Sequence, residues 1–267
     1  MSSTSSSTSE ALSKIPGRSE VFVDPDEIDV ELRTPREVRA RMLILSSILR
    51  RLALENASQD GEGDPLADAF DEREWLRDQG PASQLTAREA ALLDSPLRSI
   101  AQEAIAEVSW QGEALVVLAW AVGVLDVPPI DVTSDLQTIM DLVPRPWDAI
   151  KAWMSESTIV SESDVVRERE HAEIWHWRAT TELLRRGASP ADRHDYEAAI
   201  SEVAAEARIA GYVPALRAGD FIVRTRSIKE ISDTEVDELI AVTSQRLRAL
   251  NWLCGFGTTW DDVPLDV

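Results

Sequence analysis

The sequence predicts a mainly α protein: a single multi-helix globular domain around a buried central helix, with room for one minor β-hairpin or strand pair. Two observations carry this prediction. First, residues 114–125 form a run of 12 residues without a polar side chain, bounded by Glu113 and Asp126. A membrane span needs about 20 such residues, so the run predicts a buried core helix instead. Second, helix-start signals, a Ser or Thr followed by Pro or by Glu three residues later, recur at Thr34, Thr86, Ser95, Ser189 and Ser232.

The elements follow from these signals and from the apolar periodicity. We expect helices over residues 34–56, 65–80, 86–94, 95–125 with a break near residue 109, 135–142, 146–154, 161–187, 189–211 and 232–254. Phe221 and Val223 alternate against Ile222, so residues 220–225 are the best strand candidate, and a short pairing with residues 21–23 is open. Either Ser161 or Ser163 caps the helix that ends at residue 187.

Domain organisation is simple. Residues 1–20 are rich in Ser and Thr and lack periodic apolar side chains, so they predict a disordered leader. This start has no basic stretch and no apolar run, which excludes a signal peptide. Residues 21–267 are predicted to form one helical domain, because 44% hydrophobic content suffices for a sizeable core.

Charge and cysteine content limit the classes of function. The 48 acidic residues outnumber the 27 basic ones, which gives a net charge of −21. This balance opposes a large nucleic-acid footprint and favours a basic protein partner. Cys254 is the only cysteine, so no intrachain disulfide forms and a reducing, cytoplasmic setting fits. Neither a membrane span nor an oligomeric state is indicated.

The C-terminal stretch is unusually apolar for a tail, through Phe256, Trp260, Val263 and Leu265. We expect it to dock on the domain with Trp260 as its anchor. We call it the C-terminal clasp, and its predicted key residues are Gly255, Gly257, Trp260, Asp261 and Asp262. Asp261, Asp262 and Asp266 could together hold a cation. Without EF-hand spacing we favour another interpretation, in which one aspartate pairs with an arginine or accepts amide protons of the tail while the other meets water.

Four blocks of sequence stand out in combination. They are RTPREVRARMLILSSILRRLAL at 33–54, SWQGEALVVLAWAVG at 109–123, REREHAEIWHWR at 167–178 and RALNWLCGFGTTWDDVPLD at 248–266. Together they resemble a bacterial family catalogued only as a domain of unknown function, with ALNWL, a glycine turn, WDDV and a final Asp as its signature. Many members carry Glu-Arg-His before ALNW, where this chain has Gln245-Arg246-Leu247, so no role for that histidine carries over. The resemblance implies a shared helical fold and no activity.

Two Glu-x-x-His pairs, Glu168 with His171 and Glu173 with His176, have the spacing found in di-iron bundles. Such sites need pairs on different helices, whereas these overlap on one helix and point about 140° apart. We therefore expect no metal and no cofactor. The sequence has no G-x-S-x-G motif, and Cys254 follows an apolar helix end, so no catalytic residue is predicted and the balance is against an enzyme.

The first long helix is basic, with arginines at 33, 36, 39, 41, 50 and 51 against Glu31 and Glu37. It either meets an acidic partner or a phosphate, or is neutralised by the protein's own acids, which is the favoured interpretation.

Two functions remain open. The leading hypothesis is a non-catalytic, acidic, cytoplasmic interaction module that neutralises a basic partner. The alternative is a ligand-binding protein or enzyme with a pocket between helices, because polar side chains near Trp-rich apolar segments need partners. The residues proposed to line that pocket are Glu113, Glu173, His176, Arg178, Asn251 and Trp252.

Overall fold

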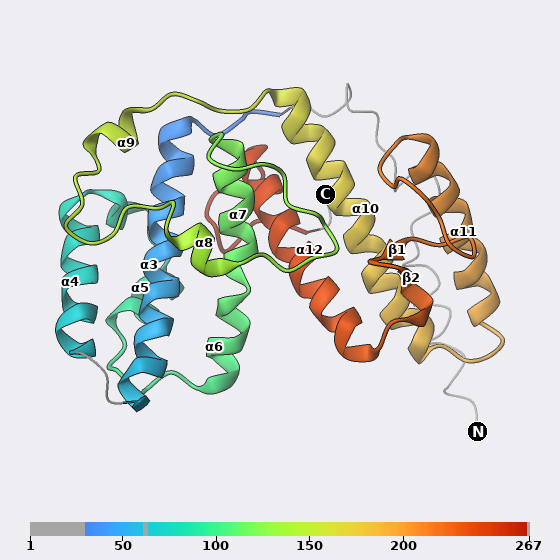
Figure 1. Cartoon of the computed structure of the whole chain (residues 1–267), viewed down its shortest axis with the longest axis horizontal. Helices are drawn as coiled ribbons and strands as arrows, with labels where there is room; N and C mark the ends of the chain where they lie inside the picture. The colour runs from blue at the N-terminus through green and yellow to red at the C-terminus, as the bar shows by residue number, and fades with distance from the viewer. Residues whose placement is uncertain (1–29, 61–63, 266–267) are drawn as a thin grey trace. The chain divides into compact units, whose positions relative to one another are not determined.

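The computed structural model describes residues 30–60 and 64–265, and these are mainly helical with one two-stranded antiparallel sheet (Figure 1). The prediction of a mainly α protein with a minor strand pair is confirmed. The chain divides into two compact units, which are described separately. The α7 unit comprises residues 30–129, 133–165 and 245–267, and the α10 unit comprises residues 130–132 and 166–244. The predicted leader at 1–20 and the candidate strand at 21–23 lie outside the described residues.

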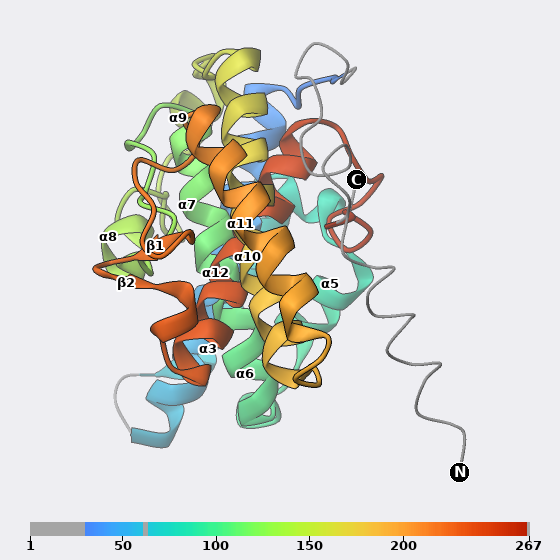
Figure 2. The ribbon, with the colours of Figure 1, turned by 90° about the vertical axis from the view of Figure 1, so that its right-hand side faces the viewer.

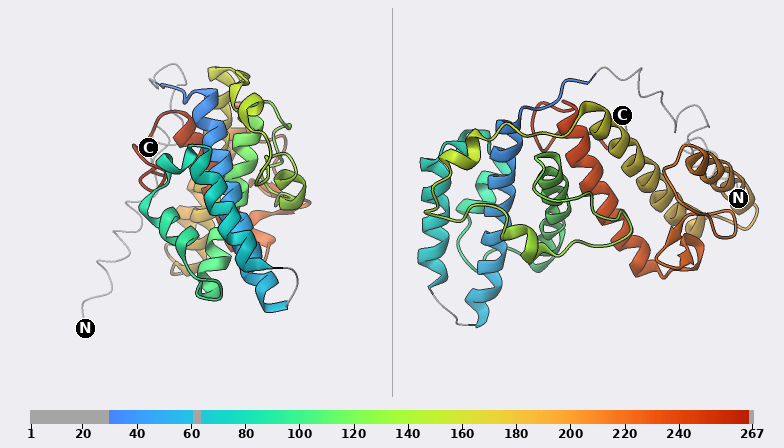
Figure 3. Two further views of the ribbon diagram at one scale, coloured as in Figure 1. Left: turned by 90° about the vertical axis from the view of Figure 1, so that its left-hand side faces the viewer. Right: turned by 45° about the horizontal axis from the view of Figure 1, so that its top comes forward.

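The α7 unit is built on its first long helix. Its elements are α3 (Pro35–Asp60), α4 (Pro65–Asp78), the short 3₁₀ helix η2 (Pro81–Gln84), α5 (Ala87–Asp94), α6 (Gln102–Ser109), α7 (Gln111–Ala121), α8 (Leu136–Met140), α9 (Lys151–Ser155) and the last turns of α12 (Asp233–Leu253). Helix α3 packs between α4 and α7, which Figure 3 shows in blue, cyan and green. It starts as predicted, because the Thr34 amide donates to the Glu37 carboxylate at 2.8 Å and the Glu37 amide donates to the Thr34 hydroxyl at 3.3 Å.

Helix α7 is the buried centre that the apolar run predicts, and every residue from 112 to 121 is buried. The helix ends four residues earlier than expected. Gly123 takes a φ of +71°, and the amides of Gly123 and Val124 donate back to the carbonyls of Trp120 and Ala119. This glycine turn satisfies the last carbonyls and stops the helix.

The helix starts predicted at Ser95-Pro96 and Ser189-Pro190 are wrong, and the latter helix begins only at Arg193, after its N-cap Asp192. Ser95-Pro96 does not begin a helix: Ser95 ends α5, Arg98 has a φ of +66°, and α6 begins at Gln102. The break near Ser109 is confirmed, because α6 and α7 are separate helices that meet at Trp110.

The α10 unit contains most of α10 (Glu162–Gly187), α11 (Arg193–Ile209), the strands β1 (Ile222–Val223) and β2 (Arg226–Ser227), the 3₁₀ helix η3 (Ile228–Glu230) and the start of α12. The Asp164 amide donates to the Ser161 hydroxyl at 3.2 Å, so Ser161 caps α10. The strands form a hairpin in which Ile222 pairs with Ser227, and Figure 2 shows it leading through η3 into α12. The expected strand at 220–225 is thus shorter, and its partner is β2.

No helix in the described chain combines the length and the apolar character that crossing a bilayer requires.

Candidate functional site

The residues predicted to line one pocket are divided between the two units. Glu113, Asn251 and Trp252 belong to the α7 unit, whereas Glu173, His176 and Arg178 belong to the α10 unit. Each group is therefore described within its own unit. Most of these polar side chains have partners that the sequence did not reveal.

Glu113 is buried on α7 and makes an ion pair with Arg246 near the end of α12. Arg246 donates to Glu113 Oε2 through Nε at 3.0 Å and through Nη2 at 2.8 Å. Ser134 donates to the same carboxylate, its amide to Oε1 at 2.7 Å and its hydroxyl to Oε2 at 2.9 Å. Arg246 also donates to the carbonyls of Pro128 and Pro129 at 3.2 and 2.7 Å. Both carboxylate oxygens are engaged, so these hydrogen bonds give Glu113 a structural role.

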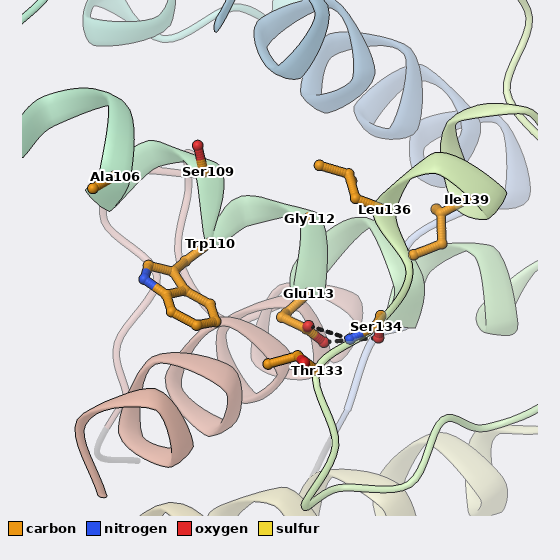
Figure 4. A pocket seen from close by; sticks show the side chains of 9 residues that line it. All are labelled: Ala106, Ser109, Trp110, Gly112, Glu113, Thr133, Ser134, Leu136 and Ile139. Atoms are coloured by element: carbon orange, nitrogen blue, oxygen red, sulfur yellow. Dashed lines mark hydrogen bonds between the residues drawn. The ribbon is translucent and has the colours of Figure 1, made fainter. Parts of the chain in front are cut away.

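A pocket of about 380 Å³ opens beside Glu113, and Figure 4 shows its lining. We call it the Glu113 pocket. Its lining is mostly apolar and comes from α6, α7, α8 and the loop before α8, through Ala106, Ser109, Trp110, Gly112, Glu113, Thr133, Ser134, Leu136 and Ile139. A Cβ on Gly112 would lie 2.9 Å from Leu136 Cδ1, so glycine allows α8 to approach α7. The arrangement suits a small apolar group.

In the α10 unit, Arg178 is fully buried and ties α10 to the segment before β1. Its Nε and Nη2 donate to the two carboxylate oxygens of Asp220 at 2.6 and 2.7 Å, and Nη2 also donates to Glu182 at 3.0 Å. Ser227 of β2 donates to the same aspartate at 3.0 Å. Because this two-pronged pair fixes the hairpin to the helix, we assign Arg178 a structural role.

The two Glu-x-x-His pairs do not converge. His171 Nδ1 lies 3.3 Å from its neighbour Glu168, whereas His176 Nδ1 lies 3.1 Å from the Thr243 hydroxyl on α12. Glu173 pairs with Arg169 at 3.1 Å, and burial raises the pKa of its carboxyl. Among residues 30–60 and 64–265, no group of three or more His, Cys, Asp and Glu side chains is placed to hold a metal ion.

The C-terminal clasp is fixed by a hydrogen bond to its backbone and by the packing of two tryptophans. Asn251 Nδ2 donates to the Pro264 carbonyl at 2.8 Å, which ties the tail to α12. Trp260 is buried and meets Trp252 edge to face at 5.7 Å. Asp262 accepts from the Thr259 amide at 2.6 Å and from the Thr258 hydroxyl at 2.7 Å, which lowers its pKa, so it caps the turn.

The remaining clasp residues make the turns and bring charge. Gly255 and Gly257 have φ values of +87° and +79°, as a reversing chain requires. Asp261 is exposed and acts electrostatically on the arginines at 41, 88 and 248. Cys254 is buried at the end of α12.

Arginines of α3 are paired within the protein, as the favoured interpretation of this basic helix predicts. Arg39 lies 2.8 Å from Glu156, Arg41 lies 2.5 Å from Glu89, Arg50 lies 3.1 Å from Glu72 and Arg51 lies 2.8 Å from Glu55.

Sequence reasoning missed Arg246 and Arg41 as central residues. The available signal was an arginine on a largely apolar helix face, with Val242 and Leu250 beside Arg246 in α12 and with Val38 and Leu45 beside Arg41 in α3. A buried arginine needs a carboxylate partner, but the sequence does not say which one.

These features define a class: a mainly α protein whose helices are fastened by buried arginine–carboxylate pairs and closed by a tryptophan-anchored tail. Within that class, the chain belongs to the family described as Domain of unknown function (DUF4272), whose model matches residues 4–205. The resemblance to a family of unknown function is thereby confirmed. The block at 248–266 lies outside the match, so the C-terminal signature stays a prediction. No curated protein and no solved structure matches the chain.

Proposed function

We propose that the protein is a non-catalytic, acidic interaction module of the bacterial cytoplasm, and that it binds and neutralises a basic protein partner. The observation that carries the proposal is that, among the described residues, the acidic excess lies at the surface. Among the described residues the buried charges nearly cancel. Six buried arginines, at positions 39, 41, 51, 169, 178 and 246, stand against seven buried acids, at positions 55, 72, 89, 113, 170, 182 and 220. The acidic excess therefore faces solvent, where it attracts basic partners.

Helix α4 supports this proposal with a surface of mixed character. Leu66 and Phe70 lie one turn apart and are 70% and 54% exposed. The same helix and its cap carry five acids that are exposed or half-buried, at positions 64, 68, 71, 74 and 78. The helix also carries Arg73, whose guanidinium carbon lies 5.6 Å from the centre of the Phe70 ring, and Arg77, which pairs with Glu74. The acids outnumber these arginines, so the apolar pair fits an amphipathic basic segment, because apolar anchors supply affinity and the acids select positive charge. We call Leu66 and Phe70 with these acids the α4 surface.

The proposal is tested by affinity capture from host lysate with three tagged baits. They are the wild-type protein, the double variant Leu66→Ser/Phe70→Ser, and Ile209→Ser as a control that removes an 87% exposed apolar side chain from α11. We expect the wild type and the control to enrich basic proteins at low salt, the double variant to lose them, and high salt to release them.

Two outcomes count against the proposal. The first is that the wild type enriches nothing over an empty matrix. The second is that all three baits recover the same proteins, which would remove the α4 surface from the argument.

The Glu113 pocket favours a second function, binding of a small apolar ligand. Its volume of about 380 Å³ lies in the range of small-molecule sites, and its walls are mostly apolar. Ala106 stands at its rim on α6 and is exposed, so Ala106→Trp would fill the entrance.

The neutral dye N-phenyl-1-naphthylamine tests this alternative by fluorescence titration. We expect saturable 1:1 binding to the wild type, loss of binding in Ala106→Trp, and retention in the control Ala198→Trp, which places the same side chain on an exposed position of α11. Equal binding by both variants would reject this pocket as the site.

A further inference from the structure

A second pocket, of about 400 Å³, lies beside the C-terminal clasp. We call it the clasp pocket. It is more polar than the Glu113 pocket. Four segments of the α7 unit line it: Arg33 with the first turns of α3, residues 83–86, the end of α12 and the tail. The residues that matter here are Arg33, Arg41, Thr86, Trp252 and Trp260.

Two buried donors of this pocket have no acceptor within residues 30–60 and 64–265. They are the indole Nε1 of Trp260, whose residue is 1% exposed, and the Nε of Arg41, whose residue is 3% exposed. The two side chains are in contact, because the Arg41 guanidinium carbon lies 5.1 Å from the centre of the Trp260 ring. A buried donor without an acceptor costs free energy, so the site favours a group that accepts hydrogen bonds.

An indole without an acceptor is not distinctive alone in this protein. The Nε1 atoms of Trp75, Trp175 and Trp177 are also buried without a hydrogen-bond acceptor among the described residues. Trp260 differs because it is one of the residues that line a pocket, and because Arg41, a cation that also carries an unpartnered donor, lines the same pocket.

Two carboxylates beside the clasp pocket already accept hydrogen bonds. Glu37 Oε2 accepts from the amide and the hydroxyl of Thr34 at 2.8 and 2.7 Å. Glu89 accepts from Arg41 at 2.5 Å and from the Thr86 amide at 2.9 Å. The unpartnered groups of the pocket are therefore hydrogen-bond donors, whereas these carboxylates already accept hydrogen bonds. A missing partner would supply acceptors, which a cation does not.

The charges agree with this conclusion. Burial lowers the pKa of Arg41, and the nearby Glu89 and Asp261 offset this only in part. A further negative group would stabilise the buried cation. Arg33 adds a second guanidinium, held by the carbonyls of Trp252 at 3.3 Å and Gly257 at 2.8 Å. The Thr86 hydroxyl accepts from the Glu89 amide at 3.2 Å, and a hydroxyl can also donate.

We propose that the clasp pocket binds a small oxyanion, a carboxylate or a phosphate group, through Trp260 Nε1, Arg41 Nε and the Thr86 hydroxyl. An oxyanion accepts several hydrogen bonds at once, and bonds to a charged acceptor are shorter and stronger than neutral ones. This site is independent of the α4 surface, and its failure would leave the interaction proposal intact.

The test observes the donor itself. Indole ¹H–¹⁵N resonances of the ¹⁵N-labelled protein are followed while sodium phosphate or sodium acetate is added, with sodium chloride at matched ionic strength as the reference. The Trp260 resonance is assigned as the one that disappears in Trp260→Phe. We expect it to shift with saturation, while the resonance of Trp75, which is equally buried and also lacks an acceptor, stays in place.

The two salts separate the possible sources. Saturation with phosphate alone identifies a phosphoryl ligand, and saturation with acetate alone identifies a carboxylate. Thr86→Val is expected to weaken the apparent affinity about 10-fold, because it removes one hydrogen bond to a charged group. Chloride shifts of equal size, or no saturation with either anion in the wild type, would overturn the proposal.

Discussion

Glu113 and Arg246 are 133 residues apart in the sequence and form a buried ion pair with Arg246 Nη2 2.8 Å from Glu113 Oε2. The pair joins the first turn of the central helix α7 to the last turns of α12. Arg246 also holds the carbonyls of Pro128 and Pro129, so one guanidinium fixes a helix and the loop that leaves the α7 unit at residue 130.

Arg246→Met should lower the free energy of unfolding by about 3 to 5 kcal/mol, because it leaves the Glu113 carboxylate buried without its cation. The double variant Glu113→Leu/Arg246→Met should recover part of this loss, because no charge then remains buried. Urea unfolding of the two single variants and the double variant measures the coupling. Additive losses would show that the two side chains do not act as a pair.

Trp260→Ala should lower the free energy of unfolding by about 3 to 5 kcal/mol, as truncation of a buried aromatic residue does. The lost contacts are the edge-to-face packing on Trp252 and the cation–π contact with Arg41. Trp147→Ala is the matched control, because Trp147 is exposed and its removal should change stability by less than about 0.5 kcal/mol. Thermal unfolding compares the two variants. Unchanged stability in Trp260→Ala would mean that the clasp is not anchored there.

Stability should fall in acid through Glu182. Burial alone would raise the pKa of this carboxyl, but hydrogen bonds from Arg185 and Arg186 and the charge of Arg178 outweigh it and lower the pKa to about 2. The pKa in the folded state is thus below that in the unfolded chain. The ionised group therefore favours folding above about pH 4.5, and this contribution is lost as the pH falls toward about 2.

Glu182→Gln is expected to be less stable at neutral pH and to lose less stability on acidification than the wild type. Between neutral pH and about pH 2, the wild type should lose about 3 kcal/mol more of its free energy of unfolding than the variant, since each pKa unit corresponds to about 1.4 kcal/mol. Urea unfolding at a series of pH values measures it. Parallel curves for the two proteins would show that other carboxylates determine the acid response.

Features that depend on neighbouring residues could be predicted from the sequence. The capping box at Thr34–Glu37 and the apolar run at 114–125 are local, and both led to the observed helices. Ser95-Pro96 carries the same kind of local signal, yet distant residues hold it as a loop. Arg51 Nη2 donates to the Ser95 carbonyl at 2.8 Å, and the Arg98 amide donates to Glu55 at 2.5 Å. These tertiary contacts outweigh the helix signal.

The candidate site was less predictable for the same reason. The expectation that Glu113 and Arg178 need partners followed from their apolar surroundings, and the structure supplies Arg246 and Asp220. These partners lie 133 and 42 residues away, and no local pattern encodes such a pairing. The Arg41–Trp260 contact is likewise visible only in three dimensions.

Two constraints require glycine at position 255, a positive φ and a close contact with another segment. Gly211 has only the first of them, so comparing the two positions tells their effects apart. The φ of +87° at Gly255 strains any residue with a Cβ, and a Cβ there would lie 2.7 Å from the Glu31 carbonyl oxygen. Gly211 has a φ of +83° with nothing within 4 Å of the added carbon. Gly211→Ala should therefore cost about 1 to 2 kcal/mol from strain alone. Gly255→Ala should cost more, because the backbone of the segment before α3 must also move. Urea unfolding of both variants measures the difference in the free energy of unfolding. Equal losses of stability would show that the segment around Glu31 moves without a cost in free energy.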